Sequence, residues 1–159
     1  MNPLNILLIG LGNMGKVHKR VIENNESTNL YGVVDTSFKK KHEIVDGLEY
    51  FNDFHLVNFD DELIDGVVIS STTNTHYEIA KQFLERNIAV FLEKPISIDK
   101  SEIEKLLILA SSQETIFRCG LIETYNPIFQ YIKGLNLNDI ISVHIYRHSQ
   151  PVAGQRKLE

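Results

Sequence analysis

The sequence predicts an α/β fold in which a doubly wound, parallel sheet is covered by helices. Short apolar segments alternate along the chain with segments whose apolar residues recur at helical spacing. Residues 4–9 and 66–70 are nearly continuous apolar runs, which are typical of strands buried on both faces of a parallel sheet. A glycine-rich turn follows the first strand, and a carboxylate ends the second. Strands that alternate with helices in this way imply parallel βαβ units.

The strands and helices can be assigned in order along the chain. We expect strands at residues 4–9, 30–34, 49–51, 66–70, 88–92 and 115–119. We expect helices at residues 14–23, 37–45 and 126–132, and two more with the buried faces Ile79, Ala80, Phe83, Leu84 and Ile103, Leu106, Leu107, Ala110. Thr75 and Glu78 are expected to form a capping box at the start of one helix, and Asp99 and Glu102 to cap the next.

The composition is that of an ordinary globular domain, with 43% hydrophobic and 23% charged residues. The net charge is −5 and the only basic block is 39–41, which argues against a nucleic-acid partner. The single cysteine, Cys119, favours a reducing compartment, and its expected role is that of a small buried hydrophobe. The apolar run at 6–11 is too short for a signal peptide or a membrane span, so we expect a cytoplasmic protein without membrane contact.

The glycine turn has the spacing G-x-G-x-x-G, placed between a predicted strand and a predicted helix. Gly10 permits a tight turn, Gly12 lets a diphosphate approach the backbone, and Gly15 lets the helix pack closely on the strand. The start of the helix then offers free N–H groups to the phosphates. The loop residues expected to bind the cofactor are Gly10, Gly12, Asn13, Met14 and Gly15. A purely structural glycine turn is the alternative.

Asp35 lies 20 residues after Gly15, at the end of the second predicted strand. A carboxylate there can accept hydrogen bonds from both hydroxyls of an adenosine ribose and repels a 2′-phosphate, so NAD is favoured over NADP. The lysines at 39–41 are close enough to affect this choice, although a solvated helix face explains them as well. The pattern predicts a Rossmann fold that holds a dinucleotide. S-adenosylmethionine enzymes also combine a glycine loop with an acid, so the loop alone leaves the ligand open.

Two further polar segments follow predicted strands and would lie at the carboxyl edge of the sheet, where open α/β folds bind ligands. The first runs from Ser70 to His76, and the second is Glu93-Lys94-Pro95. Together with the glycine loop, these segments resemble the Gfo/Idh/MocA oxidoreductases, over nearly the whole chain from Leu4 to about Arg147. Thr73 stands where that family commonly has proline.

The resemblance implies specific roles. Lys94 would be the active-site lysine that hydrogen-bonds the substrate hydroxyl, and Glu93 would accept from the nicotinamide ribose. Asn74 and His76 would line the nicotinamide side of the cleft. The remaining residues expected to contact the cofactor are Ser71, Thr72 and Lys94 itself. No metal site is expected, because His144 and His148 have no third ligand close to them in the sequence. Neither histidine is in the position of the family's catalytic histidine, which the resemblance places in the second domain.

The segment around Tyr125 and Asn126 looks like the branch that acts on nucleotide sugars, such as UDP-N-acetylglucosamine 3-dehydrogenases. Both residues could reach a substrate, but Asn126 could equally cap the helix begun by Pro127. Residues 140–148 alternate apolar and polar side chains, which predicts the first strand of a truncated second α+β domain. We therefore expect an NAD-binding domain at 1–120, a connecting helix and the start of a substrate domain at 121–153, and a disordered or vector-derived tail at 154–159.

The expected function is that of the cofactor domain of an NAD-dependent oxidoreductase. Hydride would pass between nicotinamide and a secondary alcohol of a sugar, sugar nucleotide or cyclitol. We expect these residues alone to bind NAD(H) without turnover, the full-length protein to form a homo-oligomer, and the small-molecule substrate to be sugar-like. A non-catalytic NAD-binding module or redox sensor is the first alternative, and a methyltransferase is the second.

Overall fold

The computed structural model describes residues 2–59, 63–135, 142, 144 and 146. The chain divides into two units, Met1–Leu121 and Ile122–Glu159. The first contains the sheet and its helices, and within the described part of the second are the short helices η2 (Ile122–Tyr125) and α4 (Pro127–Lys133). The predicted strand at 140–148 lies almost entirely outside the described residues.

The described part of the first unit forms one seven-stranded sheet, in the order β3-β4-β2-β1-β5-β6-β7. Its strands are β1 (Leu4–Ile9), β2 (Thr28–Val34), β3 (His42–Val45), β4 (Leu48–Phe51), β5 (Gly66–Ile69), β6 (Ala89–Leu92) and β7 (Phe117–Cys119). Among the strand pairs of the described residues, only β3–β4 is antiparallel. The strand order reverses at β1, which pairs with both β2 and β5, so the predicted doubly wound parallel fold is confirmed.

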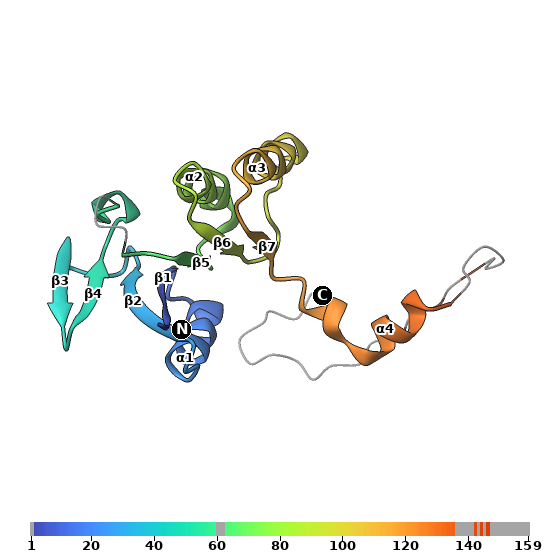
Figure 1. The fold of residues 1–159 in the computed structure, drawn as a ribbon, viewed down its shortest axis with the longest axis horizontal. Helices are drawn as coiled ribbons and strands as arrows, with labels where there is room; N and C mark the ends of the chain where they lie inside the picture. The colour runs from blue at the N-terminus through green and yellow to red at the C-terminus, as the bar shows by residue number, and fades with distance from the viewer. Residues whose placement is uncertain (1, 60–62, 136–141, 143, 145, 147–159) are drawn as a thin grey trace, which may run out of the picture. The chain divides into compact units, whose positions relative to one another are not determined.

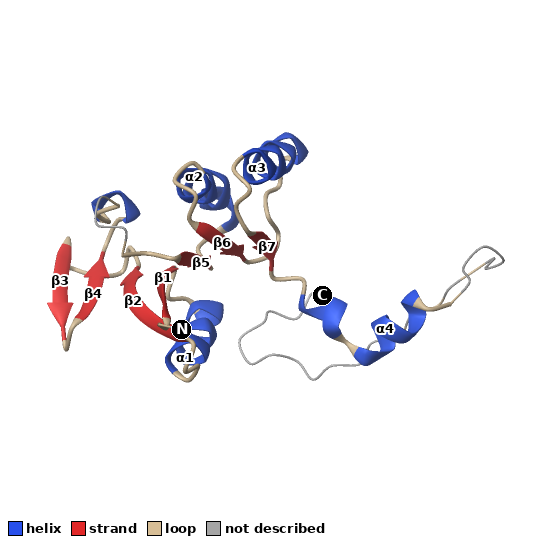
Figure 2. Ribbon diagram, in the orientation of Figure 1, coloured by secondary structure: helices blue, strands red, loops and turns tan. Residues whose placement is uncertain are grey.

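Helices cover both faces of this sheet. Figure 1 shows α1 (Asn13–Glu23) on one face, with α2 (Thr73–Leu84) and α3 (Lys100–Ser112) on the other, and Figure 2 shows the same layers by type of structure. The 3-10 helix η1 (Phe54–Leu56) follows β4. None of the described helices combines the length and apolar character needed to cross a membrane.

The parallel strands end level with one another. Ile9 at the end of β1 is paired with Val34 of β2 and with Ile69 of β5, and Ile69 is paired with Leu92 of β6. The register continues outward from Val34 to Phe51 and from Leu92 to Cys119. The loops that leave these strands therefore share one edge of the sheet, which is where the predicted polar segments lie.

The core lies mainly between the sheet and the helices α2 and α3. The side chains of Phe83 and Leu84 on α2 and of Leu106 on α3 are fully buried, as are Leu7 and Leu8 on the central strand β1. These positions follow from the continuous apolar runs of the strands and from the helical spacing of the apolar residues in α2 and α3. The packed core thus holds the strands in place, and with them the loops at the carboxyl edge of the sheet.

The helix predicted at 37–45 is wrong. Residues His42–Val45 form β3, which pairs with β4 through a two-residue turn at Asp46 and Gly47. Both turn residues have positive φ, +53° and +82°, and an Asp-Gly pair is the strongest short-range signal for such a hairpin. The three lysines before β3 repel one another and offer no apolar stripe to a helix.

The helix starts are partly as predicted. The capping box at Thr75 is wrong, because α2 begins at Thr73 with Thr72 as its N-cap and no side-chain capping bond. The Thr75 hydroxyl instead donates to the Thr72 carbonyl (2.8 Å) and pairs with the Ser71 hydroxyl (2.8 Å). The cap at Asp99 is confirmed, since its carboxylate accepts from the Ser101 N–H (2.8 Å).

The glycine turn yields a prediction about stability. A Cβ at Gly15 would lie 1.9 Å from the Gly10 carbonyl oxygen, whereas a Cβ at Gly12 would meet nothing within 4 Å. We expect Gly15→Ala to lower the free energy of unfolding by about 3 kcal/mol, because backbone atoms would have to move. Gly12→Ala should cost less than about 1 kcal/mol, the effect of a poorer N-cap residue.

Urea unfolding of the two variants measures this difference. Equal losses for Gly15→Ala and Gly12→Ala would contradict the close packing of α1 on the end of β1.

Candidate functional site

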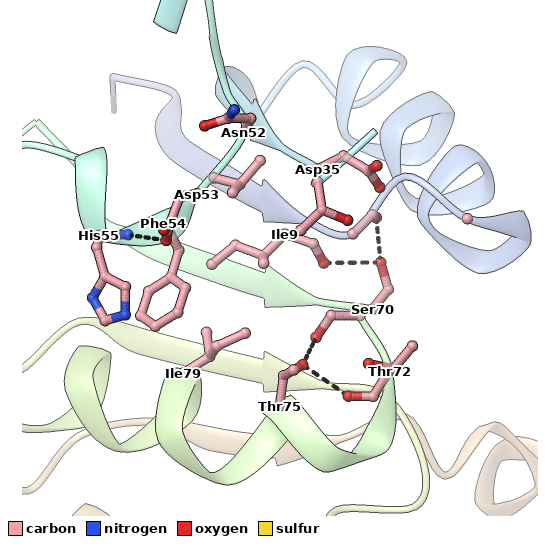
Figure 3. A pocket seen from close by; sticks show the side chains of 15 residues that line it. Ile9, Asp35, Asn52, Asp53, Phe54, His55, Ser70, Thr72, Thr75 and Ile79 are labelled. Carbon is pink, nitrogen blue, oxygen red and sulfur yellow. Dashed lines mark hydrogen bonds between the residues drawn. The ribbon is translucent and has the colours of Figure 1, made fainter. Parts of the chain in front are cut away.

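A pocket of about 550 Å³ opens at the carboxyl edge of the sheet, among the loops that follow β1, β2, β4 and β5. Figure 3 shows Asp35 and Asn52 on one side of it, and Thr72 and Thr75 on the other. The residues that line it are Ile9, Gly10, Gly12, Val34, Asp35, Thr36, Asn52, Asp53, Phe54, His55, Ser70, Ser71, Thr72, Thr75 and Ile79. The pocket therefore joins the predicted glycine loop, the predicted carboxylate and the segment after β5.

The glycine loop is shaped by three different backbone requirements. Gly10 has a φ of +90°, and a side chain there would also collide with the backbone of Ser70 and Ser71. Gly12 is exposed, and a side chain there would enter open space. As the N-cap residue of α1 it has no side chain that could accept a hydrogen bond from the N–H groups of the first turn. Free N–H groups at a helix start attract anions, and the positive end of the helix dipole adds to this. Open space beside such groups fits a diphosphate.

Asn13 and Met14 complete the loop as the first two residues of α1, and both are exposed. Behind the loop, the Ser70 hydroxyl donates to the Gly10 carbonyl (2.8 Å) and also reaches the Ile9 carbonyl (3.3 Å). The loop after β5 is therefore hydrogen-bonded to the turn after β1 and stabilises its conformation.

The Asp35 carboxylate is held by backbone N–H groups at the mouth of the pocket. One oxygen accepts from the Leu11 N–H (2.5 Å) and the other from the Ser37 N–H (2.9 Å). Burial acts to raise the pKa of Asp35, but the hydrogen bonds from the Ser37 side chain and from the two N–H groups, together with the Lys16 charge, outweigh it. The pKa of Asp35 therefore lies below its ordinary value of 3.8. The group is an anion that still has lone pairs for a ligand.

Residues 52–55 form one wall of the pocket and were not predicted from the sequence. Asp53 accepts from the His55 N–H (3.0 Å) and so starts η1, and the Phe54 ring lies 3.9 Å from the His55 ring between centroids. The rings of Phe54 and His55 offer flat surfaces to a ring system, and Asn52 offers an amide. The available signal was the strand before this segment, since Val34 and Phe51 end in register. Six further lining residues were likewise not predicted as site residues: Ile9, Val34, Thr36, Ser70, Thr75 and Ile79.

The segment after β5 contributes unevenly. Ser71 and Thr72 line the pocket, whereas Asn74 is exposed in the first turn of α2 and does not line it. His76 is only 1% exposed. Its Nδ1 lies 2.9 Å from the Pro95 carbonyl oxygen and its Nε2 lies 3.1 Å from the Ser71 carbonyl oxygen. His76 therefore lies in the interior, between the loops after β5 and β6. The sequence had predicted that it lines the cleft.

The Glu93-Lys94-Pro95 segment directly follows β6, and its Lys94–Pro95 peptide bond is cis. Lys94 is an exposed residue, so its ammonium group is available to a ligand. Glu93 is only 8% exposed. One carboxylate oxygen lies 2.8 Å from Nε2 of His18, and the other accepts from the Lys94 N–H (3.2 Å). His18, on α1, was not singled out by the sequence analysis.

Cys119, at the end of β7, is a partly buried free thiol. Burial, and secondly the charge of Glu93, raise the pKa of this thiol, which fits the small hydrophobe expected from the sequence. Among the described residues there is no group of three or more His, Cys, Asp or Glu side chains that could hold a metal ion.

The described part of the second unit places Tyr125 and Asn126 at the junction of η2 and α4. Tyr125 is strongly exposed. Asn126 is the N-cap of α4, where its side chain accepts from the Ile128 N–H (3.0 Å) and Pro127 is the first helical residue. The capping role left open by the sequence is thus present.

The chain is similar to known oxidoreductases. The sequence profile of the Gfo/Idh/MocA family, an oxidoreductase family with an NAD-binding Rossmann fold, matches residues 4–121. Inositol 2-dehydrogenase of Rhizobium meliloti is 28% identical over 79% of the chain and 38% of its own length. UDP-N-acetylglucosamine 3-dehydrogenase of Acidithiobacillus ferrooxidans is 25% identical over 79% of the chain and 39% of its own length.

Solved structures agree with this relationship. The crystal structure of D-galactose-1-dehydrogenase from Rhizobium etli superposes with a TM-score of 0.71 at 25% identity, over 84% of this chain and 42% of that one. The chain thus spans about two fifths of the length of these relatives. The profile match, the strand order and the glycine loop lead to one conclusion: the chain belongs to the Gfo/Idh/MocA oxidoreductases, and residues 4–121 are the NAD-binding Rossmann domain of that family.

Proposed function

We propose that this chain is the cofactor-binding part of an NAD-dependent dehydrogenase that acts on a secondary alcohol of a sugar, a sugar nucleotide or a cyclitol. The observation that carries the proposal is the pocket in which the uncapped start of α1 and the Asp35 carboxylate face the same space. One group suits a diphosphate and the other suits a ribose diol, and together they match the two polar parts of an adenosine dinucleotide.

Each part of the cofactor has candidate partners among the described residues. Gly10, Gly12 and the first turn of α1, at Asn13, Met14 and Gly15, would hold the diphosphate. Asp35 would bind the adenosine ribose, and the wall at 52–55 would cover the adenine. Ser71 and Thr72 would line the passage toward the nicotinamide side, where Asn74 and Glu93 follow. When bound, NAD supplies the nicotinamide ring that accepts or returns a hydride.

Lys94 is the group that we propose acts on the substrate. Its ammonium group would donate a hydrogen bond to the substrate oxygen and stabilise the negative charge that develops there as the hydroxyl proton leaves to a base. The carbon would then lose its hydride and the oxygen would become that of a carbonyl group. The relatives' names mention inositol and UDP-N-acetylglucosamine, both of which carry ring secondary alcohols, and this supports the substrate class. Tyr125 and Asn126 are proposed substrate contacts, in a segment 121–153 that would lead into a substrate domain.

The proposal extends to the setting of the whole protein. We propose a cytoplasmic enzyme with a small sugar-type substrate, a homo-oligomeric state in the full-length form, and preference for NAD over NADP. The single thiol, Cys119, supports a reducing compartment, and Asp35 supports the cofactor preference because it would repel a 2′-phosphate.

Calorimetry with this chain tests the cofactor assignment directly. NAD⁺, NADP⁺ and S-adenosylmethionine are titrated separately into the protein. We expect NAD⁺ to bind more tightly than NADP⁺ by at least about tenfold, and S-adenosylmethionine not to bind. Tight binding of S-adenosylmethionine without NAD⁺ would point to a methyltransferase and overturn the proposal.

Substitution of Gly12 tests the diphosphate site. A Cβ at Gly12 meets no protein atom, so Gly12→Ala and Gly12→Val should fold, but the added atoms occupy the space proposed for the diphosphate. We expect the Kd for NAD⁺ to rise about tenfold for alanine and further for valine, as measured by calorimetry. If the Gly12→Val protein binds NAD⁺ like the unchanged chain, the diphosphate lies elsewhere.

Substitution of Asp35 tests the ribose site. Asp35→Asn removes the charge while keeping the shape, and hydrogen bonds to a charged group contribute about 1.5–3 kcal/mol, so the Kd for NAD⁺ should rise about tenfold or more. The ratio of the Kd for NADP⁺ to the Kd for NAD⁺ should also become smaller in this variant. Asp46→Asn is the matched control, since Asp46 sits in a turn with positive φ that asparagine also adopts.

The pH dependence of this effect follows from the lowered pKa of Asp35. The carboxylate stays mostly ionised until the pH falls below 3.8, the ordinary pKa of an aspartate. Its contributions to binding and to folding are therefore present above that pH and are lost as acid protonates the carboxylate. The affinity ratio of the unchanged chain to Asp35→Asn should therefore be flat from about pH 5 to about pH 8. A ratio that rises steeply with pH in this range would show that a different group is responsible.

Substitution of Lys94 tests the catalytic role, in a chain that carries the proposed substrate domain. Lys94→Met should lower kcat by about 10²–10⁴-fold, the range for a proton-donating side chain, while NAD⁺ binding to the present chain changes only a few-fold. Lys100→Met, at the exposed start of α3, is the control for loss of a lysine charge. Unchanged turnover in Lys94→Met would remove Lys94 from the mechanism.

A further inference from the structure

We propose that His18 is a positioning residue that holds the Glu93 carboxylate in the orientation needed on the nicotinamide side of the site. This inference rests on the proposed function, because it concerns the turn that carries Lys94. The central observation is the 2.8 Å distance between Nε2 of His18 and a carboxylate oxygen of Glu93, in side chains that are 17% and 11% exposed.

The direction of this hydrogen bond follows from the chemistry of its partners. An ionised carboxylate can only accept, so Nε2 of His18 carries the hydrogen and donates it. A carboxylate with so little exposure to water needs such partners, because a buried charge without them is costly. The second oxygen of Glu93 accepts from the Lys94 N–H at 3.2 Å. Each oxygen thus has one protein donor and retains a lone pair for a ribose hydroxyl.

The packing around the pair leaves Glu93 few other orientations. A Cβ at Gly120 would lie 3.1 Å from the second carboxylate oxygen, so the carboxylate lies beside Gly120 in space that any larger residue there would crowd. The His18 ring packs edge-on against Phe91, with 5.4 Å between centroids. Phe91 and Glu93 are two residues apart at the end of β6 and so point to the same face of the sheet, where α1 lies. His18 is therefore fixed by one of these residues and fixes the other.

The position of His18 on α1 links the two halves of the proposed cofactor site. His18 comes three residues after Gly15, which places both on the same face of the helix. Gly15 fixes α1 against the end of β1, where the first turn would meet the diphosphate, and His18 reaches the loop after β6. One rigid helix thus presents the diphosphate site and orients the carboxylate beside Lys94.

His76 supports the same turn from a second direction. Its Nδ1 lies 2.9 Å from the Pro95 carbonyl oxygen, two residues beyond Glu93. The half-buried His18 holds the Glu93 side chain at one end of the turn, and the buried His76 holds the Pro95 backbone at its other end. A turn held at both ends has few conformations to lose when a cofactor binds.

The test uses two amides of different reach in this chain. A glutamine amide nitrogen can occupy the place of the histidine Nε2, whereas an asparagine amide reaches only the place of Nδ1. We compare His18→Gln with His18→Asn for binding of ADP, ADP-ribose and NADH. ADP lacks the second ribose, so it reports the adenosine and diphosphate site alone.

We expect His18→Asn to weaken ADP-ribose and NADH about fivefold to tenfold while the Kd for ADP stays within about twofold. His18→Gln should restore all three affinities to within about twofold of the unchanged chain. In a Glu93→Gln background, His18→Asn should add no further loss. A general structural role would weaken ADP equally and would not be rescued by glutamine.

Three results would overturn the inference while leaving the proposed function intact: no effect of His18→Asn on NADH, an equal loss for ADP, or failure of His18→Gln to bind NADH although it folds and binds ADP. If His18→Asn does not fold, His18→Gln alone decides, because it must keep full NADH affinity. Failure of the unchanged chain to bind NADH would instead refute the proposed function itself.

Discussion

The arrangement of the site depends on the close approach of α1 to the end of β1, at Gly15 against the Gly10 carbonyl oxygen. With no side chain at that contact, the helix can begin directly beneath the strand end. Its first N–H groups then face the edge of the sheet where Asp35 and Ser71 lie, and its next turn brings His18 to Glu93. Any residue larger than glycine at position 15 would shift all of these groups together.

The second constraint is the level ending of the parallel strands, which turns residues distant in sequence into neighbours. In-register pairing carries the edge from Phe51 through Val34, Ile9 and Ile69 to Leu92. The pocket lies over one part of this edge and the Lys94 turn over another. A cofactor with two nucleotide halves spans such an edge naturally, since its length matches several strands and not a single loop.

The sequence predicted those parts of the site that reflect local backbone needs, and missed those that depend on tertiary packing. The three glycines and Asp35 follow from a strand, a turn and a helix in succession, so their spacing is visible in the sequence. His18 looks like any polar residue of an amphipathic helix, and only the packing of α1 beside β6 places it at Glu93. Residues 52–55 were missed although the strand before them was predicted, because only the pairing of β4 beside β2 brings the loop after β4 to the pocket. The hairpin before this loop was also missed, although Asp46-Gly47 was a hairpin signal within the sequence.

The groups proposed to contact the cofactor and the substrate are of different kinds in this domain. The proposed cofactor contacts are mostly backbone N–H groups, absent side chains and a carboxylate held by the backbone, all of which the fold itself imposes. The proposed contribution to the substrate is one exposed lysine on a turn held by two histidines. Relatives named for inositol and for UDP-N-acetylglucosamine share this region at 28% and 25% identity. A rigid turn that presents a single ammonium group can serve any alcohol brought to it, so substrate choice can change without disturbing the cofactor site.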